Sequence, residues 1–157
     1  MKNLRIARWT VEYDPEVTRS LYAKIPIGRA EACCGSCRNF ASAREQAYSP
    51  YIRSLLETLD IDLRKEEDVI HHPDPPDPLH HYEGLFWFAG RITSGRDGYE
   101  ETGKRGWKPD FEKVDERTNL GITLGPFRRA PKSQGTPWLL LVIETKVPWV
   151  SEEEEHW

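Results

Sequence analysis

The order of the apolar patterns along the chain predicts an α+β fold, with a mainly antiparallel sheet and two consecutive helices packed on one face. Apolar and polar residues alternate from Arg5 to Tyr13, which is the two-residue period of a half-buried strand. Helical signals follow over residues 38–60. Two strongly apolar segments, 81–92 and 138–147, then predict the centre of the sheet.

A short helix is expected directly after the first strand. Asp14 is a suitable N-cap and Pro15 suits the first helical position. The two longer helices come next. Residues 38–48 contain good helix formers without Gly or Pro, and Ser36 is expected to cap them. The pair Ser49-Pro50 restarts the helix, which ends near Asp60 and carries apolar residues at helical spacing, namely Ile52, Leu55, Leu56 and Leu59.

The second half of the chain supplies the main strands. Val69-Ile70 is a candidate edge strand, and the prolines that follow it up to Pro78 predict an extended, stiff surface segment. The 81–92 strand is apolar on both faces, so it needs a covering layer on each side. A folded-back loop, further strands or a partner subunit would provide the second layer.

Residues 94–117 show no helical or strand pattern and are expected to form a long loop. Its isolated aromatic residues, Tyr99, Trp107 and Phe111, either pack back on the sheet or form an interaction surface. Another half-buried strand is expected around Ile122, followed by a loop over 125–137.

The 157-residue length suits one α+β domain over residues 1–150, followed by an acidic C-terminal tail over 151–157. The tail is expected to fray, although Trp157 can dock. A formal net charge of −4 argues against general nucleic-acid binding. No apolar stretch approaches the roughly 20 residues that span a bilayer, so we expect no membrane partner and a cytoplasmic location.

Three cysteines, Cys33, Cys34 and Cys37, lie within five residues, and the chain has no others. The two-residue gap between Cys34 and Cys37 lets both sulfurs share one metal ion or form one disulfide. A zinc site needs further ligands, and the histidine pairs 71–72 and 80–81 flank the proline segment. Neighbours on a strand point to opposite faces, so one histidine from each pair is a sensible candidate at most. The candidate metal ligands are therefore Cys34, Cys37 and His81.

Two other readings of the cysteines stay open. The thiols can be structural fillers of a core, because free cysteine is among the most buried residue types. They can also form a reactive dithiol, because a helix N-terminus lowers the pKa of a thiol. Elsewhere, the charge run Glu66-Glu67-Asp68 is expected to be a solvated face, and Arg44 is expected to snorkel or to join a buried ion pair.

Several motifs together resemble a small uncharacterised bacterial family with a Cys-x-x-Cys-Arg-Asn-Phe motif. They are Cys34 to Phe40, Leu59-Asp60-Ile61-Asp62 with Lys65, His81-Tyr82-Glu83-Gly84, and Val147-Pro148-Trp149-Val150. In the family's pattern a glycine stands at the position of Asp60, which suits a left-handed helix end. The resemblance covers most of the chain and implies a bacterial, cytoplasmic protein, but it implies no activity.

The leading expectation for function is a non-enzymatic binding or interaction module that uses its aromatic loop and sheet surface. Its partner would be an unknown protein or small molecule, with a homo-oligomer as a further option. The first alternative is a zinc-type metal-binding protein that uses the Cys33–Cys37 cluster. The second alternative is a thiol-dependent redox enzyme.

Overall fold

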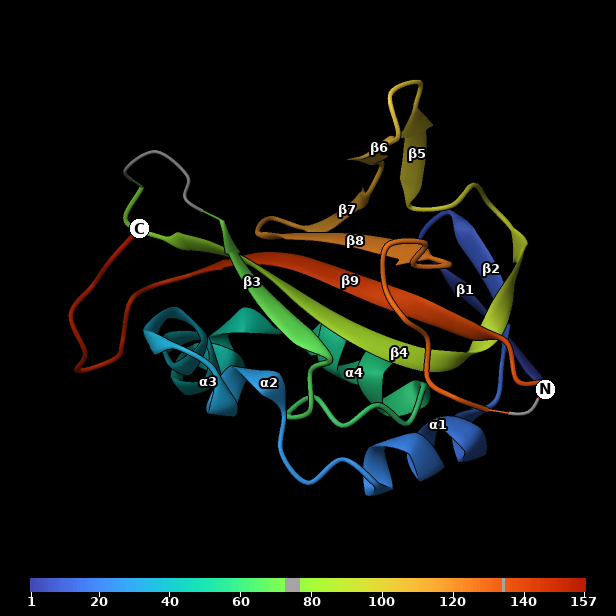
Figure 1. Cartoon of the computed structure of the whole chain (residues 1–157), viewed down its shortest axis with the longest axis horizontal. Helices are drawn as coiled ribbons and strands as arrows, with labels where there is room; N and C mark the ends of the chain where they lie inside the picture. Colours follow the sequence, from blue (N-terminus) through green and yellow to red (C-terminus); the bar gives the residue numbers. More distant parts are fainter. Residues whose placement is uncertain (73–76, 134) are drawn as a thin grey trace.

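The computed structural model describes residues 1–72, 77–133 and 135–157 (Figure 1). The elements follow one another as β1 (Lys2–Ile6), β2 (Trp9–Tyr13), α1 (Pro15–Ala23), α2 (Arg29–Ala32), α3 (Gly35–Ala47), α4 (Pro50–Thr58), β3 (Asp68–His72), β4 (His80–Ser94), β5 (Tyr99–Thr102), β6 (Gly106–Pro109), β7 (Glu112–Asp115), β8 (Thr118–Thr123) and β9 (Trp138–Val147). The protein therefore combines helices with a large sheet, as the order of its apolar patterns predicts.

The main sheet has seven strands in the order β1-β2-β4-β9-β8-β7, and β3 also pairs with β4. Every pairing found among the described strands is antiparallel. The β4–β9 ladder is the centre of the sheet and runs from His80 opposite Val147 to Ala89 opposite Trp138. Both central strands were predicted from their continuous apolar character.

The prediction of one strand over Arg5–Tyr13 is wrong, because this segment forms the β1–β2 hairpin. Ile6 pairs with Trp9, which leaves Ala7 and Arg8 as a two-residue turn. Ala7 has a φ of 52°, in the left-handed region that such turns require. The alternation of apolar residues runs on through the turn, and for this reason the pattern resembles a single strand.

The helix starts are set by local capping. The Asp14 side chain accepts hydrogen bonds from backbone N–H groups of α1, and the Ser49 side chain accepts one from α4. A proline follows each of these N-caps, as predicted. The prediction that Ser36 caps the third helix is wrong, because α3 begins at Gly35 and Cys34 is its N-cap residue. The short α2 was not predicted.

The sheet has an apolar cluster on each face. On one face, buried side chains of α3 and α4 such as Phe40 and Leu56 belong to the same cluster as Phe86 and Phe88 of β4. In the view of Figure 1 these two helices lie below the sheet. The other cluster consists of Leu85, Trp87, Ala89, Trp138, Leu140 and Val142.

A covering layer for this second cluster comes from the chain itself. Val17 and Leu21 of α1 pack against it, together with Tyr99 and Phe111 from the 94–117 region. The Trp138 indole also donates a hydrogen bond of 2.8 Å to Ser133 in the preceding loop. The sequence left a folded-back loop, further strands or a partner subunit as options for this layer. The structure shows that the folded-back 94–117 region contributes to it, together with helix α1.

The prediction of a long patternless loop over 94–117 is wrong, because the segment contains β5, β6 and β7. β5 and β6 form a separate two-stranded hairpin, the arm that rises above the sheet in Figure 1. The arm strands are four residues each and largely exposed. Short, polar strands lack the apolar alternation on which a prediction of β-structure depends.

The edge strand expected at Val69-Ile70 is present as β3, which pairs with β4 from Asp68 to His72. The extended proline segment predicted after it falls largely on residues 73–76, which lie outside the described residues. On β3, His72 pairs with His81 of β4 and His71 pairs with Tyr82, so one histidine of each pair lies directly opposite the other.

The expectation of a solvated charged face is wrong for Glu66, whose side chain is fully buried. The Arg44 guanidinium on α3 binds both of its carboxylate oxygens, at 2.9 and 3.0 Å. The Tyr48 hydroxyl donates to the same carboxylate at 3.2 Å. Of the two roles considered for Arg44, the buried ion pair is the one observed.

Candidate metal centre at the start of helix α3

The three cysteines lie at the junction of two helices. Cys33 follows α2, and Cys34 is the extended N-cap residue of α3, with φ −119° and ψ −179°. Cys37 falls three residues after the cap, in the first helical turn. An N-cap side chain and the third helical residue face each other across this turn, so the backbone brings the two sulfurs together.

The three Sγ atoms all lie within 4.8 Å of one another. Cys34 Sγ and Cys37 Sγ are 3.5 Å apart, and all three cysteines are free thiols. Two sulfurs bound to one tetrahedral zinc ion are separated by about 3.8 Å, given a Zn–S bond of about 2.3 Å. The group can therefore hold a metal ion without a large change in the backbone.

The environments of Cys34 and Cys37 differ. Cys34 is exposed, and its pKa lies below the ordinary value, first because the backbone N–H of Cys37 stabilises the thiolate. Cys37 is buried beneath it, with Sγ 3.8 Å from the Val69 carbonyl oxygen of β3. Burial raises the pKa of Cys37 to about 12. The corner thus presents an accessible thiol with a lowered pKa above a buried thiol with a raised pKa.

The structure does not bring His81 to the thiols. Tyr82 shares a sheet face with Phe86, on the α3 side, and its hydroxyl donates to the Ser36 carbonyl oxygen at 2.9 Å. His81 precedes it on β4 and therefore points to the opposite face. There, its Nε2 lies 3.4 Å from a Glu144 carboxylate oxygen. Of the histidines on β3 and β4, His71 and His80 lie on the α3 face, because His71 pairs with Tyr82 and His80 is two residues before it.

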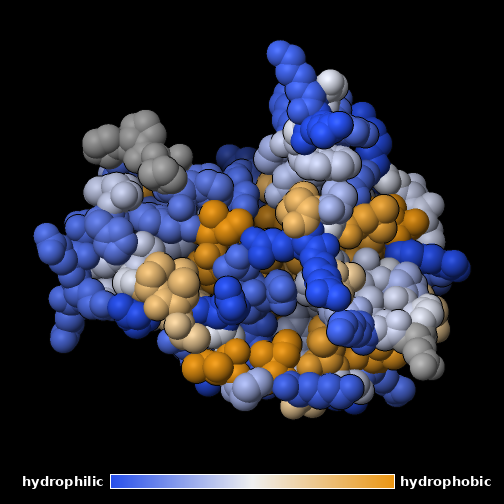
Figure 2. Space-filling model, in the orientation of Figure 1, coloured by the Kyte–Doolittle hydropathy of each residue, from blue (hydrophilic) through white to orange (hydrophobic). Residues whose placement is uncertain are grey.

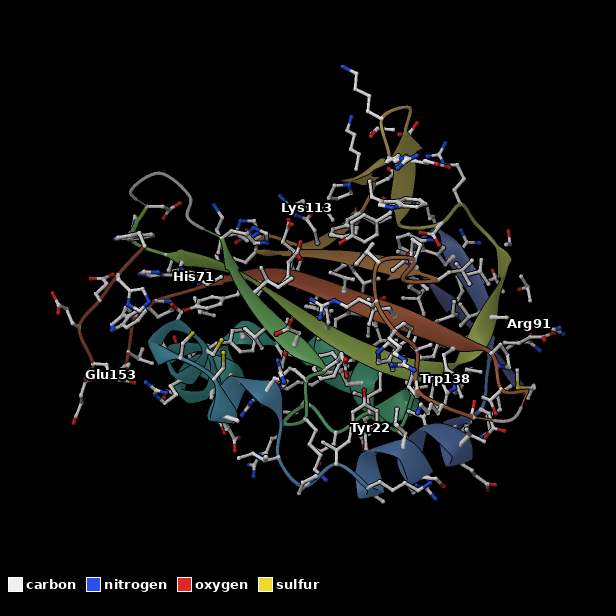
Figure 3. The ribbon with its side chains drawn as sticks, viewed as in Figure 1. Tyr22, His71, Arg91, Lys113, Trp138 and Glu153 are labelled. Atoms are coloured by element: carbon white, nitrogen blue, oxygen red, sulfur yellow. The ribbon has the colours of Figure 1, made fainter. Side chains whose placement is uncertain are left out.

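The chain after β9, residues 148–157, folds back onto the start of α3, so the acidic C-terminal tail over 151–157 does not fray as expected. Arg38 binds both carboxylate oxygens of Glu153, at 2.8 and 2.7 Å. The buried Asn39 accepts the backbone N–H groups of Val150 and Ser151, at 2.7 and 3.0 Å. Figure 3 shows Glu153 on the tail and His71 on β3 at the same end of the molecule.

The tail also covers His80, whose side chain is fully buried. The Trp157 indole stacks on the His80 ring, with 3.8 Å between ring centroids. Glu155 lies 2.7 Å from His80 Nε2, and His71 Nε2 lies 3.0 Å from His80 Nδ1. The docking of Trp157 is the part of this arrangement that was expected from the sequence.

A second polar cluster, which the sequence analysis did not predict, lies on the face opposite the thiols. Glu83 and Glu144 are direct neighbours across β4 and β9. The His72 imidazole lies 3.5 Å from Glu83, and Asn119 donates to Glu144 at 2.8 Å. Burial raises the pKa of Glu83, whereas the hydrogen bond with His81 lowers that of Glu144.

The three residues of the expected interaction surface do not form one surface, because Trp107 lies apart from Tyr99 and Phe111. Tyr99 and Phe111 contact each other edge-on, at 5.3 Å between ring centroids, and both pack against the second apolar cluster. Trp107 lies on β6 of the arm and is 43% exposed. Figure 2 shows the arm covered mainly by hydrophilic residues. The exposed aromatic surface of this region is thus smaller than the sequence suggests.

Comparison with known proteins does not extend this description. No protein-family model, no curated protein and no solved structure matches the chain. Within the part of the chain that the structure describes, no helix has the length and apolar character needed to cross a bilayer. The fold and the three-thiol corner therefore define the class: a mixed α/β protein with a group of cysteines that can hold a metal ion.

Proposed function

We propose that this protein is a non-enzymatic binding module that holds one zinc-type metal ion through the thiolates of Cys33, Cys34 and Cys37. The observation that carries the proposal is the grouping of their three sulfur atoms within 4.8 Å. Soft thiolate ligands favour zinc and similar ions over magnesium or calcium. A reducing cytoplasm would keep the thiols free to bind.

The ion would have a structural role at this corner. Cys33 follows α2, Cys34 and Cys37 open α3, and Cys37 contacts β3 through Val69. An ion bound to all three sulfurs would therefore fasten two helices to the edge of the sheet. Thiol protons are released when the ligands bind, so affinity would rise with pH.

Elemental analysis of untagged protein, purified under reducing conditions, tests the proposal. We expect one zinc ion per chain and three thiols that resist modification until a chelator is added. Cys34→Ser should abolish stoichiometric binding, because it removes the central ligand of the three. Protein that contains no stoichiometric metal, and that binds none from added zinc, would overturn the proposal. His81→Ala is the matched control and should keep the ion, because His81 lies on the other face of the sheet.

One observation favours a second candidate function, a dithiol that exchanges with disulfides. Exposed Cys34 lies 3.5 Å from buried Cys37, which is the arrangement of an attacking and a resolving thiol. The Cys34 thiolate would attack a substrate disulfide and release one thiolate. Cys37, once deprotonated, would then attack the mixed disulfide, release the second thiolate and leave a Cys34–Cys37 disulfide.

Glutathione redox buffers distinguish this candidate from a metal site. A dithiol would give metal-free protein with a reversible two-electron transition, lost in both Cys34→Ser and Cys37→Ser. Cys33→Ser should leave that transition in place, although it removes a metal ligand. A transition that needs Cys33, or none at all, would exclude the dithiol function.

A further inference from the structure

Three thiolates leave one position of a tetrahedral ion to be filled. The tail residue His156 contacts the start of α3. Its Nε2 lies 2.5 Å from Ser36 Oγ, and its Cε1 lies 3.3 Å from where a Cβ on Gly35 would stand. Gly35 and Ser36 are the two residues that separate Cys34 from Cys37. The imidazole therefore lies against the backbone that carries two of the ligands.

The hydrogen bonds of this imidazole identify which nitrogen can bind a metal. His156 Nδ1 lies 3.3 Å from the Glu154 carbonyl oxygen, and a carbonyl can only accept. The proton of the neutral ring therefore sits on Nδ1, and Nε2 carries a lone pair that accepts from the Ser36 hydroxyl. A metal-bound histidine commonly donates its other N–H to a carbonyl in this way. Nε2 therefore faces the start of α3 and carries the lone pair that a metal ion requires.

Contacts on both sides of His156 hold the tail beside the start of α3. Arg38 binds Glu153 with two hydrogen bonds, and Asn39 accepts two backbone N–H groups. The Trp149 indole closes the tail on itself by donating to the Glu153 carbonyl oxygen at 3.0 Å. On the far side of His156, Trp157 stacks on buried His80. His156 is thus anchored from both sides.

We propose that the C-terminal tail closes the metal centre and that His156 Nε2 is the fourth ligand of the ion held by Cys33, Cys34 and Cys37. The inference rests on the proposed function. The ring nitrogens of His156 lie outside the group formed by the three sulfur atoms, so on metal binding the imidazole shifts from Ser36 toward the ion, while Nδ1 keeps the Glu154 carbonyl oxygen. An imidazole adds no negative charge, which suits a site beside the four consecutive glutamates 152–155.

Cobalt(II) titration of the full-length reduced protein, followed by X-ray absorption of the bound cobalt, tests the ligand. The wild type should show three sulfur ligands and one imidazole nitrogen. His156→Ala should keep the three sulfurs, replace the nitrogen by water oxygen and bind cobalt at least about 10-fold more weakly, because loss of an outer-shell partner alone already costs about 10–100-fold. His156→Gln should behave as His156→Ala does. His81→Ala, which also removes one imidazole, should match the wild type in both readouts.

The outcomes separate the two proposals. A wild-type site with three sulfurs, unchanged in affinity and ligands by His156→Ala, would overturn the role of His156 and leave the metal site standing. Loss of the nitrogen in His81→Ala would also overturn it. A wild-type protein that binds no cobalt, or binds it without the three sulfurs, would overturn the proposed function itself. Far-UV circular dichroism confirms that each variant is folded.

Discussion

At the scale of single residues, the ion pair between Arg44 and Glu66 is the most deeply buried charge arrangement described. The Glu66 side chain is fully buried and the Arg44 side chain is 8% exposed. Arg44 also lies 3.2 Å from Glu31, so it connects α2 and α3 to the segment before β3. A buried charge that loses its partner keeps its desolvation cost, whereas an exposed pair contributes little.

Arg44→Met should therefore lower the free energy of unfolding by about 3–5 kcal/mol, because it leaves the Glu66 carboxylate buried without a cation. Urea unfolding followed by tryptophan fluorescence measures the loss. The control is Arg38→Met on the same helix, whose ion pair with Glu153 is exposed, and it should cause a much smaller loss. Equal losses in the two variants would contradict the argument from burial.

Glu83 and Glu144 provide a residue-scale prediction of pH dependence. Burial raises the folded-state pKa of Glu83, so its negative charge costs stability above its unfolded pKa of about 4.3. Glu83→Gln should stabilise the protein at pH 7, by less than about 1 kcal/mol, and the gain should vanish near pH 4. Thermal unfolding across this pH range measures the difference.

Glu144→Gln is the matched variant and should have the opposite sign. The pKa of Glu144 is lowered, first by its hydrogen bond with His81, so its charge contributes stability above the unfolded pKa. That contribution is lost as the pH falls through the folded-state pKa. Glu144→Gln should therefore destabilise the protein at pH 7 and approach the wild type in acid. If both substitutions changed the stability at pH 7 in the same direction, the opposite pKa shifts of Glu83 and Glu144 would be contradicted.

At the scale of elements, α4 ends in a Schellman motif. The N–H of Asp60 binds the Glu57 carbonyl oxygen at 3.0 Å, and that of Ile61 binds Leu56 at 2.9 Å. Asp60 has a φ of 60°, so the helix ends in a left-handed residue. A side chain at this position carries backbone strain that glycine avoids.

Asp60→Gly should raise the free energy of unfolding by about 0.5–1 kcal/mol, because relief of the left-handed strain outweighs the loss of the exposed ion pair with Arg19. Calorimetric melting temperatures measure the change. Asp60→Ala, which loses the same ion pair and keeps the strain, should melt below the wild type. An Asp60→Gly protein that melts no higher than Asp60→Ala would disprove the strain argument.

The region from Tyr99 to Asp115 has two parts with different roles. Phe111 packs against the second apolar cluster and lies directly over Gly121 of β8, where a Cβ would collide with its ring. Trp107 lies on the exposed arm. Phe111 therefore belongs to the covering layer of the sheet, and Trp107 remains the available part of the predicted interaction surface.

Phe111→Ala should cost about 2 kcal/mol of unfolding free energy, because it opens a gap in a partly buried layer. Trp107→Ala should change stability by less than about 0.5 kcal/mol. Guanidinium titration of both variants makes the comparison. If Trp107→Ala were the more destabilising of the two, the arm would be part of the packed structure and not an accessible surface.

At the scale of the whole molecule, the candidate site is assembled from parts far apart in the chain. The thiols come from residues 33–37, Cys37 packs on Val69 of β3, and His156 reaches Ser36 across 120 residues of sequence. The sheet fixes these parts by its order, in which β3 and the end of β9 both flank β4. The tail follows the C-terminal end of β9, which lies at the end of the sheet where α3 begins.

Local physical chemistry explains what the sequence alone determined. Apolar runs and alternation predicted both central strands and the β3 edge strand, and cap residues predicted the starts of α1 and α4. The grouping of the thiols was also predictable, because five consecutive residues at a helix start cannot separate far. Each of these features depends on contacts between close neighbours in sequence.

The tertiary structure alone decided which histidine faces the thiols, where the acidic tail docks and that Glu66 is buried beside Arg44. A one-residue shift on β4 exchanges His80 for His81 between the faces of the sheet, and no local pattern specified the choice. The sequence of the tail alone predicts a solvated run of charges. In the folded protein, Arg38, Asn39 and His80 bind this segment. These features depend on contacts between distant segments, which exist only after the strands have paired.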